Sequence, residues 1–211
     1  MYEKRPRNLE SEENSLTISV EPLTSEKIPT FIPIMTDGIR DAFIPVIATY
    51  GDALKNESEK QISMRTSAYY TSFLEDPDKI VLLAKKSGDI IAGLEAEVID
   101  VSIPPDPNNP TFVSHVTSSE AMLDLHGKKV AYVNWVCVKS HNRGGRERGA
   151  GSFLYRELES LLGARGDISA IVAQIFNVND ASLRLHERAG VSDVLGKGAK
   201  GRAVWYGKRI Q

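Results

Sequence analysis

The sequence has little cysteine and histidine, and it contains no long apolar run. Its single cysteine, Cys137, excludes an intrachain disulfide framework and a cysteine cage for zinc. The four histidines are scattered without an HxxxH spacing, so we expect no metal site. No segment approaches the ~20 apolar residues of a membrane-spanning helix, and the N-terminus lacks the apolar core of a signal peptide. We therefore expect no membrane partner and a reducing, cytoplasmic setting.

A strong charge of either sign is also missing. The chain has 26 Lys and Arg against 28 Asp and Glu, which gives a net charge of −2. Such a balance provides no basic surface of the kind that attracts nucleic acid, so we expect no nucleic-acid partner. The length of 211 residues suits one domain. We assign residues 16–211 to that domain and the polar segment 1–15 to a disordered tail.

The rest of the sequence alternates strand and helix signals. Alternating or β-branched runs predict strands, and apolar residues at helical spacing predict amphipathic helices. We expect strands at 16–20, 80–85, 90–99, 130–138, 168–176 and 203–209, and helices at about 25–50, 58–74, 149–162 and 180–189. Pro45 is expected to end the first helix, and a capping box at 58–61 to begin the second. A proline-rich insertion with one short helix is expected at about 101–129.

An arginine- and glycine-rich segment joins the strand at 130–138 to the following helix. A helix N-terminus carries free backbone N–H groups and a partial positive charge, and glycines let that backbone approach a pyrophosphate closely. Three arginines, Arg143, Arg146 and Arg148, add fixed positive charge. The pattern indicates an anion site, although ordinary turn glycines remain an alternative. The GxxxxGK[ST] and GxGxxG patterns of nucleotide-binding proteins are both absent.

Two motifs in this half of the chain resemble the GNAT N-acetyltransferases. Residues 146–151, Arg-Glu-Arg-Gly-Ala-Gly, fit the family's coenzyme loop [Q/R]-x-x-G-x-[G/A], which follows a strand ending in valine, here Val138. Residues 179–191 fit the next family motif, N-x-x-[A/S]-x-x-[L/F]-Y-x-x-x-G-[F/V], except that His186 replaces the tyrosine. Residues 143–145 lengthen the loop, so the roles of the three arginines stay open. The Ser-x-x-Leu-His-Glu combination is similar to the phosphinothricin- and amino-acid-acetylating branch.

The resemblance implies an α/β fold with a mixed, mostly antiparallel sheet, helices on both sides and splayed central strands. It implies acetyl-CoA as co-substrate and a primary amine of a small molecule or amino acid as acceptor. The pantetheine would lie between the splayed strands. The residues expected to hold the coenzyme are Val136, Cys137, Val138, Arg143, Arg146, Arg148, Gly149, Ala150, Gly151, Ser152, Asn179 and Ser182.

In this family a tyrosine protonates the departing thiolate, so the resemblance makes His186 a candidate general acid or coenzyme contact. A helix-surface histidine without chemistry is the alternative. Cys137 has no polarising partner in any motif, so we interpret its side chain as core packing.

The sequence does not determine the general base. Related enzymes place a glutamate where this chain has Tyr132. Asn134 is a polar residue in an apolar strand, and either binds substrate or water or is a hydrogen-bonded core amide. Glu95 and Glu97 share one face of the neighbouring strand and could act as a base through water, but a solvated sheet face is the favoured interpretation.

Other functions also stay open. They are a CoA-binding regulatory module without turnover, a peptide or protein N-acetyltransferase, and a nucleotide- or phosphate-binding protein. Whether the chain forms a homodimer is undecided. We hypothesise that the insertion at 101–129 caps the acceptor pocket.

Overall fold

The computed structural model describes residues 17–101, 125–139, 149–197 and 201–210. Several expectations fall outside these ranges. They are the tail at 1–15, most of the insertion with its helix, and the three arginines Arg143, Arg146 and Arg148.

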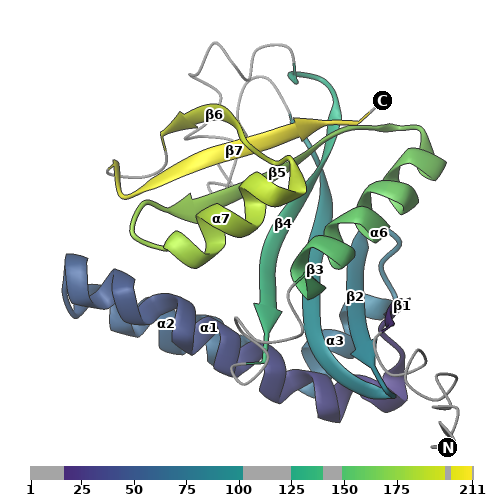
Figure 1. Ribbon diagram of the computed structural model, residues 1–211, viewed down its shortest axis with the longest axis horizontal. Helices are drawn as coiled ribbons and strands as arrows, with labels where there is room; N and C mark the ends of the chain where they lie inside the picture. Colours follow the sequence, from purple (N-terminus) through teal and green to yellow (C-terminus); the bar gives the residue numbers. More distant parts are fainter. Residues whose placement is uncertain (1–16, 102–124, 140–148, 198–200, 211) are drawn as a thin grey trace, which may run out of the picture.

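Within the described residues, seven strands form one sheet in the order β1-β2-β3-β4-β5-β7-β6 (Figure 1). Among these described strands only the β4–β5 pair is parallel, so the sheet is mixed and mostly antiparallel, as expected. The strands are β1 (Ile18–Pro22), β2 (Lys79–Lys86), β3 (Asp89–Asp100), β4 (Lys129–Val138), β5 (Ile168–Phe176), β6 (Asp193–Lys197) and β7 (Ala203–Arg209).

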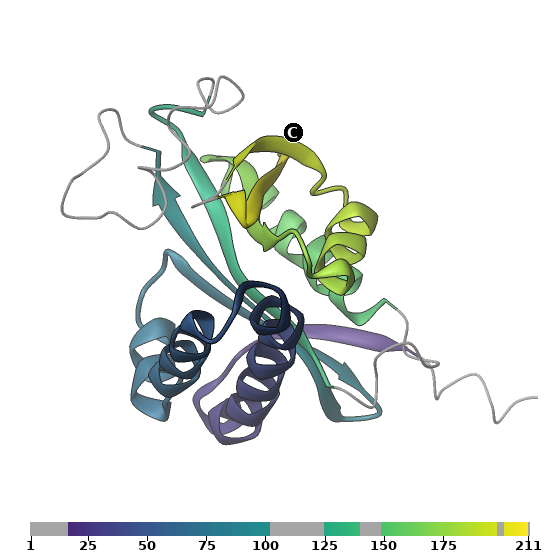
Figure 2. The same cartoon turned by 90° about the vertical axis from the view of Figure 1, so that its left-hand side faces the viewer.

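Helices cover both faces of the sheet (Figure 2). The short 3-10 helix η2 (Ser25–Lys27) leads into α1 (Ile28–Tyr50), which with α2 (Ala53–Met64) and α3 (Ser67–Leu74) lies on one face. Helices α6 (Ala150–Arg165) and α7 (Asp180–Ala189) lie on the other. The faces have separate apolar cores because alternate strand residues point to opposite sides of the sheet.

The two central strands separate halfway along their length. Strands β4 and β5 pair in parallel from Lys129↔Ile168 to Val133↔Ala173 and no further. Beyond that point, in the part of the chain that the structure describes, β4 continues its pairing with β3 and β5 its pairing with β7. Figure 1 shows the two strands diverging towards their carboxyl ends. The expected splay is confirmed, since within the described residues the β4–β5 pairing ends at Val133 and Ala173.

Two local expectations are wrong, and one strand was missed. Ser58 lies inside α2 and is buried, and the separate helix α3 is capped by Thr66, whose Oγ1 accepts the Tyr69 N–H at 3.2 Å. Pro45 does not end α1, which continues to Tyr50, because buried residues on both sides of the proline hold the helix against the sheet. Strand β6 was not expected, since its sequence is short and contains Gly196.

Candidate active site

The N-terminus of α6 fits an anion. Gly149 precedes the helix with a φ of 114°, a value that favours glycine. The first bond that closes the helix runs from the Phe153 N–H to the Gly149 carbonyl at 2.9 Å, so the N–H groups of Ala150, Gly151 and Ser152 come before it. The first turn contains no acidic residue. These groups therefore present a positive helix end near the opening between β4 and β5.

Gly151 has a packing role as well. A Cβ atom at this position would lie 2.7 Å from Leu185 Cδ1, closer than real Cβ contacts allow. The glycine therefore lets α6 and α7 approach each other, independently of any coenzyme.

The carboxyl half of β4 separates its side chains between the two faces. Val136 and Val138 pack on the α6 side, whereas Cys137 is buried on the α1 side. The Cys137 Sγ lies 3.7 Å from the Met35 carbonyl oxygen, and α1 passes so close that Gly38 has no room for a Cβ. The thiol is thus part of the core, and only backbone atoms at Cys137 remain candidates for coenzyme contact.

Asn179 and Ser182 form the start of α7. The Asn179 Oδ1 accepts the Ser182 N–H at 3.1 Å, which is an N-cap. The amide of Asn179 therefore has a structural partner before any ligand is considered.

His186 is buried, with 6% of its surface exposed, so the helix-surface interpretation is wrong. Its Nδ1 lies 2.8 Å from the Ser182 carbonyl, which accepts only, so Nδ1 carries the proton. Nε2 then accepts the Tyr155 hydroxyl proton at 2.6 Å. Burial lowers the pKa of His186 and favours this neutral form. Both ring nitrogens are therefore engaged between α6 and α7.

Asn134 and Glu97 meet at an irregularity of the sheet. Glu95 pairs with Trp135 but Ala96 pairs with Val133, so Asn134 is the extra residue of a β-bulge. Its side-chain amide donates to the Glu97 carboxylate, and burial raises the pKa of Glu97. The bulge comes directly after the last β4–β5 pair, so this carboxylate lies beside the start of the splay.

Tyr132 is the cross-strand partner of Glu97. Its ring packs against Trp205 of β7 with 5.7 Å between centroids, and burial raises the pKa of its phenol. The structure thus brings Tyr132, Asn134 and Glu97 together on the α1 face, whereas His186 lies on the α6 face.

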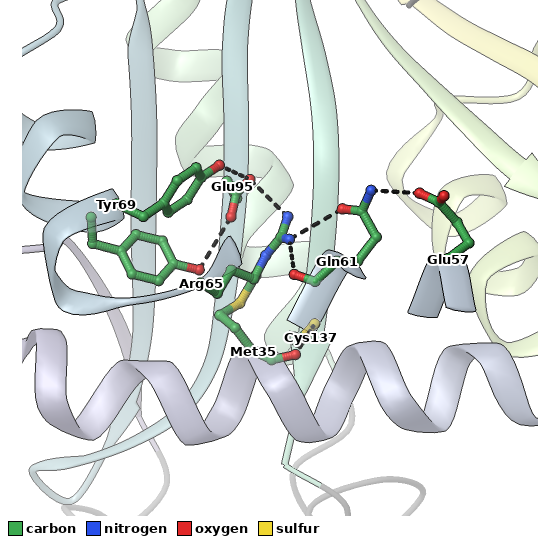
Figure 3. A network of polar contacts seen from close by, with 8 residues as sticks. Met35, Glu57, Gln61, Arg65, Tyr69, Glu95 and Cys137 are labelled. Carbon is green, nitrogen blue, oxygen red and sulfur yellow. Dashed lines mark hydrogen bonds and ion pairs between the residues drawn. The ribbon is translucent and has the colours of Figure 1, made fainter. Parts of the chain in front are cut away.

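Glu95 belongs to a polar cluster that the sequence did not indicate (Figure 3). It is fully buried, so the expected solvated face is wrong at this residue. Its carboxylate accepts hydrogen bonds from Arg65 Nη2 at 3.1 Å, Tyr69 at 2.9 Å and Tyr70 at 3.2 Å. The partners lie 25 to 30 residues away along the chain, beyond the reach of a local pattern.

Aromatic rings occupy the α1 face of the splay. Phe43 of α1 contacts Trp135 of β4 and Phe176 of β5, with centroid distances of 6.1 Å and 5.7 Å. The three rings bridge the two strands where they no longer pair, and they place an apolar wall on the same face as Glu97.

The described residues contain no group of three or more His, Cys, Asp or Glu side chains that could hold a metal ion. Within those same residues, no helix is long and apolar enough to cross a membrane.

Comparison with known proteins gives a family. The model of the acetyltransferase (GNAT) family matches residues 48–191, more than half of the chain. No curated protein sequence matches.

Solved structures with the same fold are distant in sequence. PaiA N-acetyltransferase from Thermoplasma acidophilum, solved with coenzyme A, is 13% identical with a TM-score of 0.64, and the match covers 92% of this chain and 99% of that one. NAA60 from Arabidopsis thaliana, solved with acetyl-CoA, is 15% identical with a TM-score of 0.57 and covers 92% and 99%. Ribosomal-protein-alanine N-acetyltransferase from Brucella melitensis is 18% identical with a TM-score of 0.55 and covers 91% and 99%.

Proposed function

The chain belongs to the acetyltransferase (GNAT) family, and on that premise we propose that it moves the acetyl group of acetyl-CoA to a primary amine of a small molecule or amino acid. The observation that carries the proposal is the opening between β4 and β5, with a helix N-terminus on one face and a half-buried carboxylate on the other. Two substrates that approach from opposite faces would meet there.

The coenzyme would lie on the α6 side. The N–H groups of Ala150, Gly151 and Ser152 would bind its pyrophosphate, with help from the arginines of the preceding loop. Backbone groups of β4 at residues 136–138, beyond its last pair with β5, would bind the pantetheine amides. A backbone N–H in this segment would stabilise the oxyanion that forms during transfer.

Glu97 is the side chain that best fits a general base. An acceptor amine arrives as an ammonium ion and must lose a proton before it attacks the thioester carbon. A carboxylate with a raised pKa takes that proton more readily than an ordinary one. Asn134 would orient Glu97, and Tyr132 would form part of the surrounding wall. The C–S bond then breaks, and the coenzyme thiolate takes up a proton.

His186 fits a positioning role better than direct proton donation. Its Nε2 accepts the Tyr155 proton and its Nδ1 proton is donated to a carbonyl, so giving a proton to sulfur would require breaking a contact. We propose that His186 and Tyr155 together fix α7 against α6 and so shape the coenzyme wall.

The aromatic wall supports an acceptor with an apolar group near its amine. Rings of Phe43, Trp135 and Phe176 lie on the face that also carries Glu97. A peptide N-terminus is the second candidate, because two of the similar structures, from Escherichia coli and Brucella melitensis, are named as acetyltransferases of a ribosomal-protein alanine.

Calorimetry with acetyl-CoA, followed by thiol release with a panel of amines, tests the function. The panel pairs arylalkylamines with free amino acids and short peptides, which separates the two acceptor classes. Binding with amine-dependent thiol release supports the proposal. Binding without turnover on any amine would instead indicate a regulatory CoA-binding module, and no binding by folded protein would overturn the proposal.

A further inference from the structure

Arg65 lies at the corner between α2 and α3, and only 5% of its surface is exposed. Its Nη1 donates to the Gln61 carbonyl at 2.5 Å and to Gln61 Oε1 at 3.2 Å, and Nη2 donates to Glu95 at 3.1 Å. Figure 3 shows the guanidinium between the helix that carries Gln61 and the strand that carries Glu95. One side chain therefore joins α2 to β3.

The buried Glu95 carboxylate accepts hydrogen bonds from three side chains. Tyr69 and Arg65 share Oε1, and Tyr70 binds Oε2. The buried ion pair between Arg65 and Glu95 adds little net stability, because removing two charges from water costs about as much as their attraction returns. The three hydrogen bonds do, however, fix the position of the Glu95 carboxylate relative to Arg65, Tyr69 and Tyr70.

This cluster lies beside the bulge. Glu95 is the cross-strand partner of Trp135, and the register changes at the next position, where Asn134 is inserted. The Arg65 guanidinium lies over the Trp135 ring at 5.5 Å. Arg65 thus contacts both residues of the last regular pair before the bulge, one by a hydrogen bond and the other by cation–π packing.

The Nε donor of Arg65 supports the same interpretation. Among the described residues, the buried Nε atom has no hydrogen-bond partner. The position of the guanidinium therefore leaves one of its own donors, Nε, without a hydrogen bond to any described residue. The guanidinium sits where it spans Glu95, Gln61 and the Trp135 ring.

We propose that Arg65 is a positioning residue for acetyl transfer: by holding Glu95 and Trp135 together, it fixes the bulge that directs Asn134 towards Glu97. The inference rests on the proposed function, in which Glu97 is the base. Arg65 does not touch either substrate. It acts through the β3–β4 pair on the group that orients the base.

The test removes the Arg65–Glu95 ion pair without leaving an unpaired buried charge. The double variant Arg65→Met with Glu95→Gln keeps the side-chain volumes similar and eliminates both charges. We expect a folded protein with unchanged acetyl-CoA binding, and with a kcat reduced about 10- to 100-fold, because small misplacements of catalytic groups have effects of that size. If this variant does not fold, Arg65→Lys keeps the charge but lacks the planar fork, and is expected to lose part of kcat in the same way.

A cycle with Asn134→Ala separates positioning from general weakening. If Arg65 acts through Asn134, the Arg65→Met/Glu95→Gln pair lowers kcat little further in the Asn134→Ala background. Fully additive losses, or an unchanged kcat in the Asn134-containing variant, would overturn the proposal.

A readout without turnover keeps this result apart from the function itself. The side-chain amide resonance of Asn134, identified by its loss in Asn134→Ala, is expected to shift in the Arg65→Met/Glu95→Gln protein. If the Asn134 resonance does not shift, the proposed role of Arg65 is overturned even when the enzyme is active. A shifted Asn134 resonance in a protein that acetylates no amine would support the structural effect of Arg65 on Asn134. It would count against the proposed function instead.

Discussion

The Tyr155 hydroxyl lies 2.6 Å from Nε2 of His186, and both side chains are buried between α6 and α7. This contact occupies the atom that a general acid would use. It also joins α6, whose N-terminus we propose binds the coenzyme, to α7, which follows β5. His186 therefore packs against the helix that carries the proposed pyrophosphate site.

His186 should make stability depend on pH. Its folded pKa is lowered by burial, so near pH ~6 the unfolded chain binds more protons than the folded one. Stability is then complete above the unfolded pKa of about 6.5 and falls as the pH drops below it. Urea unfolding at about pH 7.5 and pH 5.5 should show a smaller pH effect in His186→Gln than in the wild type. Equal pH effects in the two proteins would contradict this account.

Tyr155→Phe is the companion change. It leaves the buried Nε2 of His186 without a donor, which should cost about 1–3 kcal/mol of unfolding free energy at neutral pH. The measurement is the urea midpoint at constant slope, and an unchanged midpoint would show that the contact carries no net stability.

Gly149→Ala tests the coenzyme loop, and Gly166→Ala is its matched control. Both glycines flank α6 with positive φ, 114° and 70°, so both substitutions strain the backbone. Only Gly149 lies at the end proposed to bind pyrophosphate. We expect Gly149→Ala to weaken acetyl-CoA binding about tenfold or more while Gly166→Ala lowers stability alone, since only the first moves the N–H donors. Calorimetry decides, and equal affinities in both variants would remove the loop assignment.

Much of this fold could be predicted from the sequence, because strong local signals set it. The β2–β3 hairpin follows from two apolar runs around Ser87 and Gly88, and both residues have the positive φ that a tight hairpin turn requires. Helix α7 has the predicted bounds, since Asn179 caps it and Gly190 ends it with a φ of 75°. The motif around Gly149 likewise predicted a strand before it and a helix after it, and both are observed as β4 and α6.

The parts that could not be predicted depend on tertiary contacts. Pro45 is a helix breaker by local rules, yet buried neighbours such as Phe43 and Val46 hold the helix through it. The bulge at Asn134 appears only when β4 is paired with β3. The burial of Glu95 depends on Arg65 and two tyrosines from a different segment, so alternation along β3 alone suggested a solvated face.

Gly151→Ala should destabilise the protein by about 1–3 kcal/mol, the usual cost of overpacking a close contact. The added methyl group would meet Leu185 at 2.7 Å. Combining it with Leu185→Ala should recover part of the loss, since the shortened side chain leaves room for the new methyl group. Thermal unfolding of the single and double variants measures the recovery. Additive destabilisation would show that the helix contact is not what requires glycine here.

Glu97→Gln tests the base, with Asp100→Asn as the control at the exposed end of the same strand. If Glu97 removes the proton from the ammonium, kcat/KM of the wild type falls as the pH drops through the Glu97 pKa, which burial holds above its ordinary value. Glutamine cannot accept that proton, so kcat should fall about 100-fold or more, and the acid limb of the profile should disappear. Asp100→Asn should leave both unchanged, because that side chain is exposed and lies far along β3 from the bulge. An acid limb that persists in Glu97→Gln would assign the proton transfer to another group. The role of the Glu97 carboxylate would then be limited to accepting the hydrogen bond from the Asn134 amide.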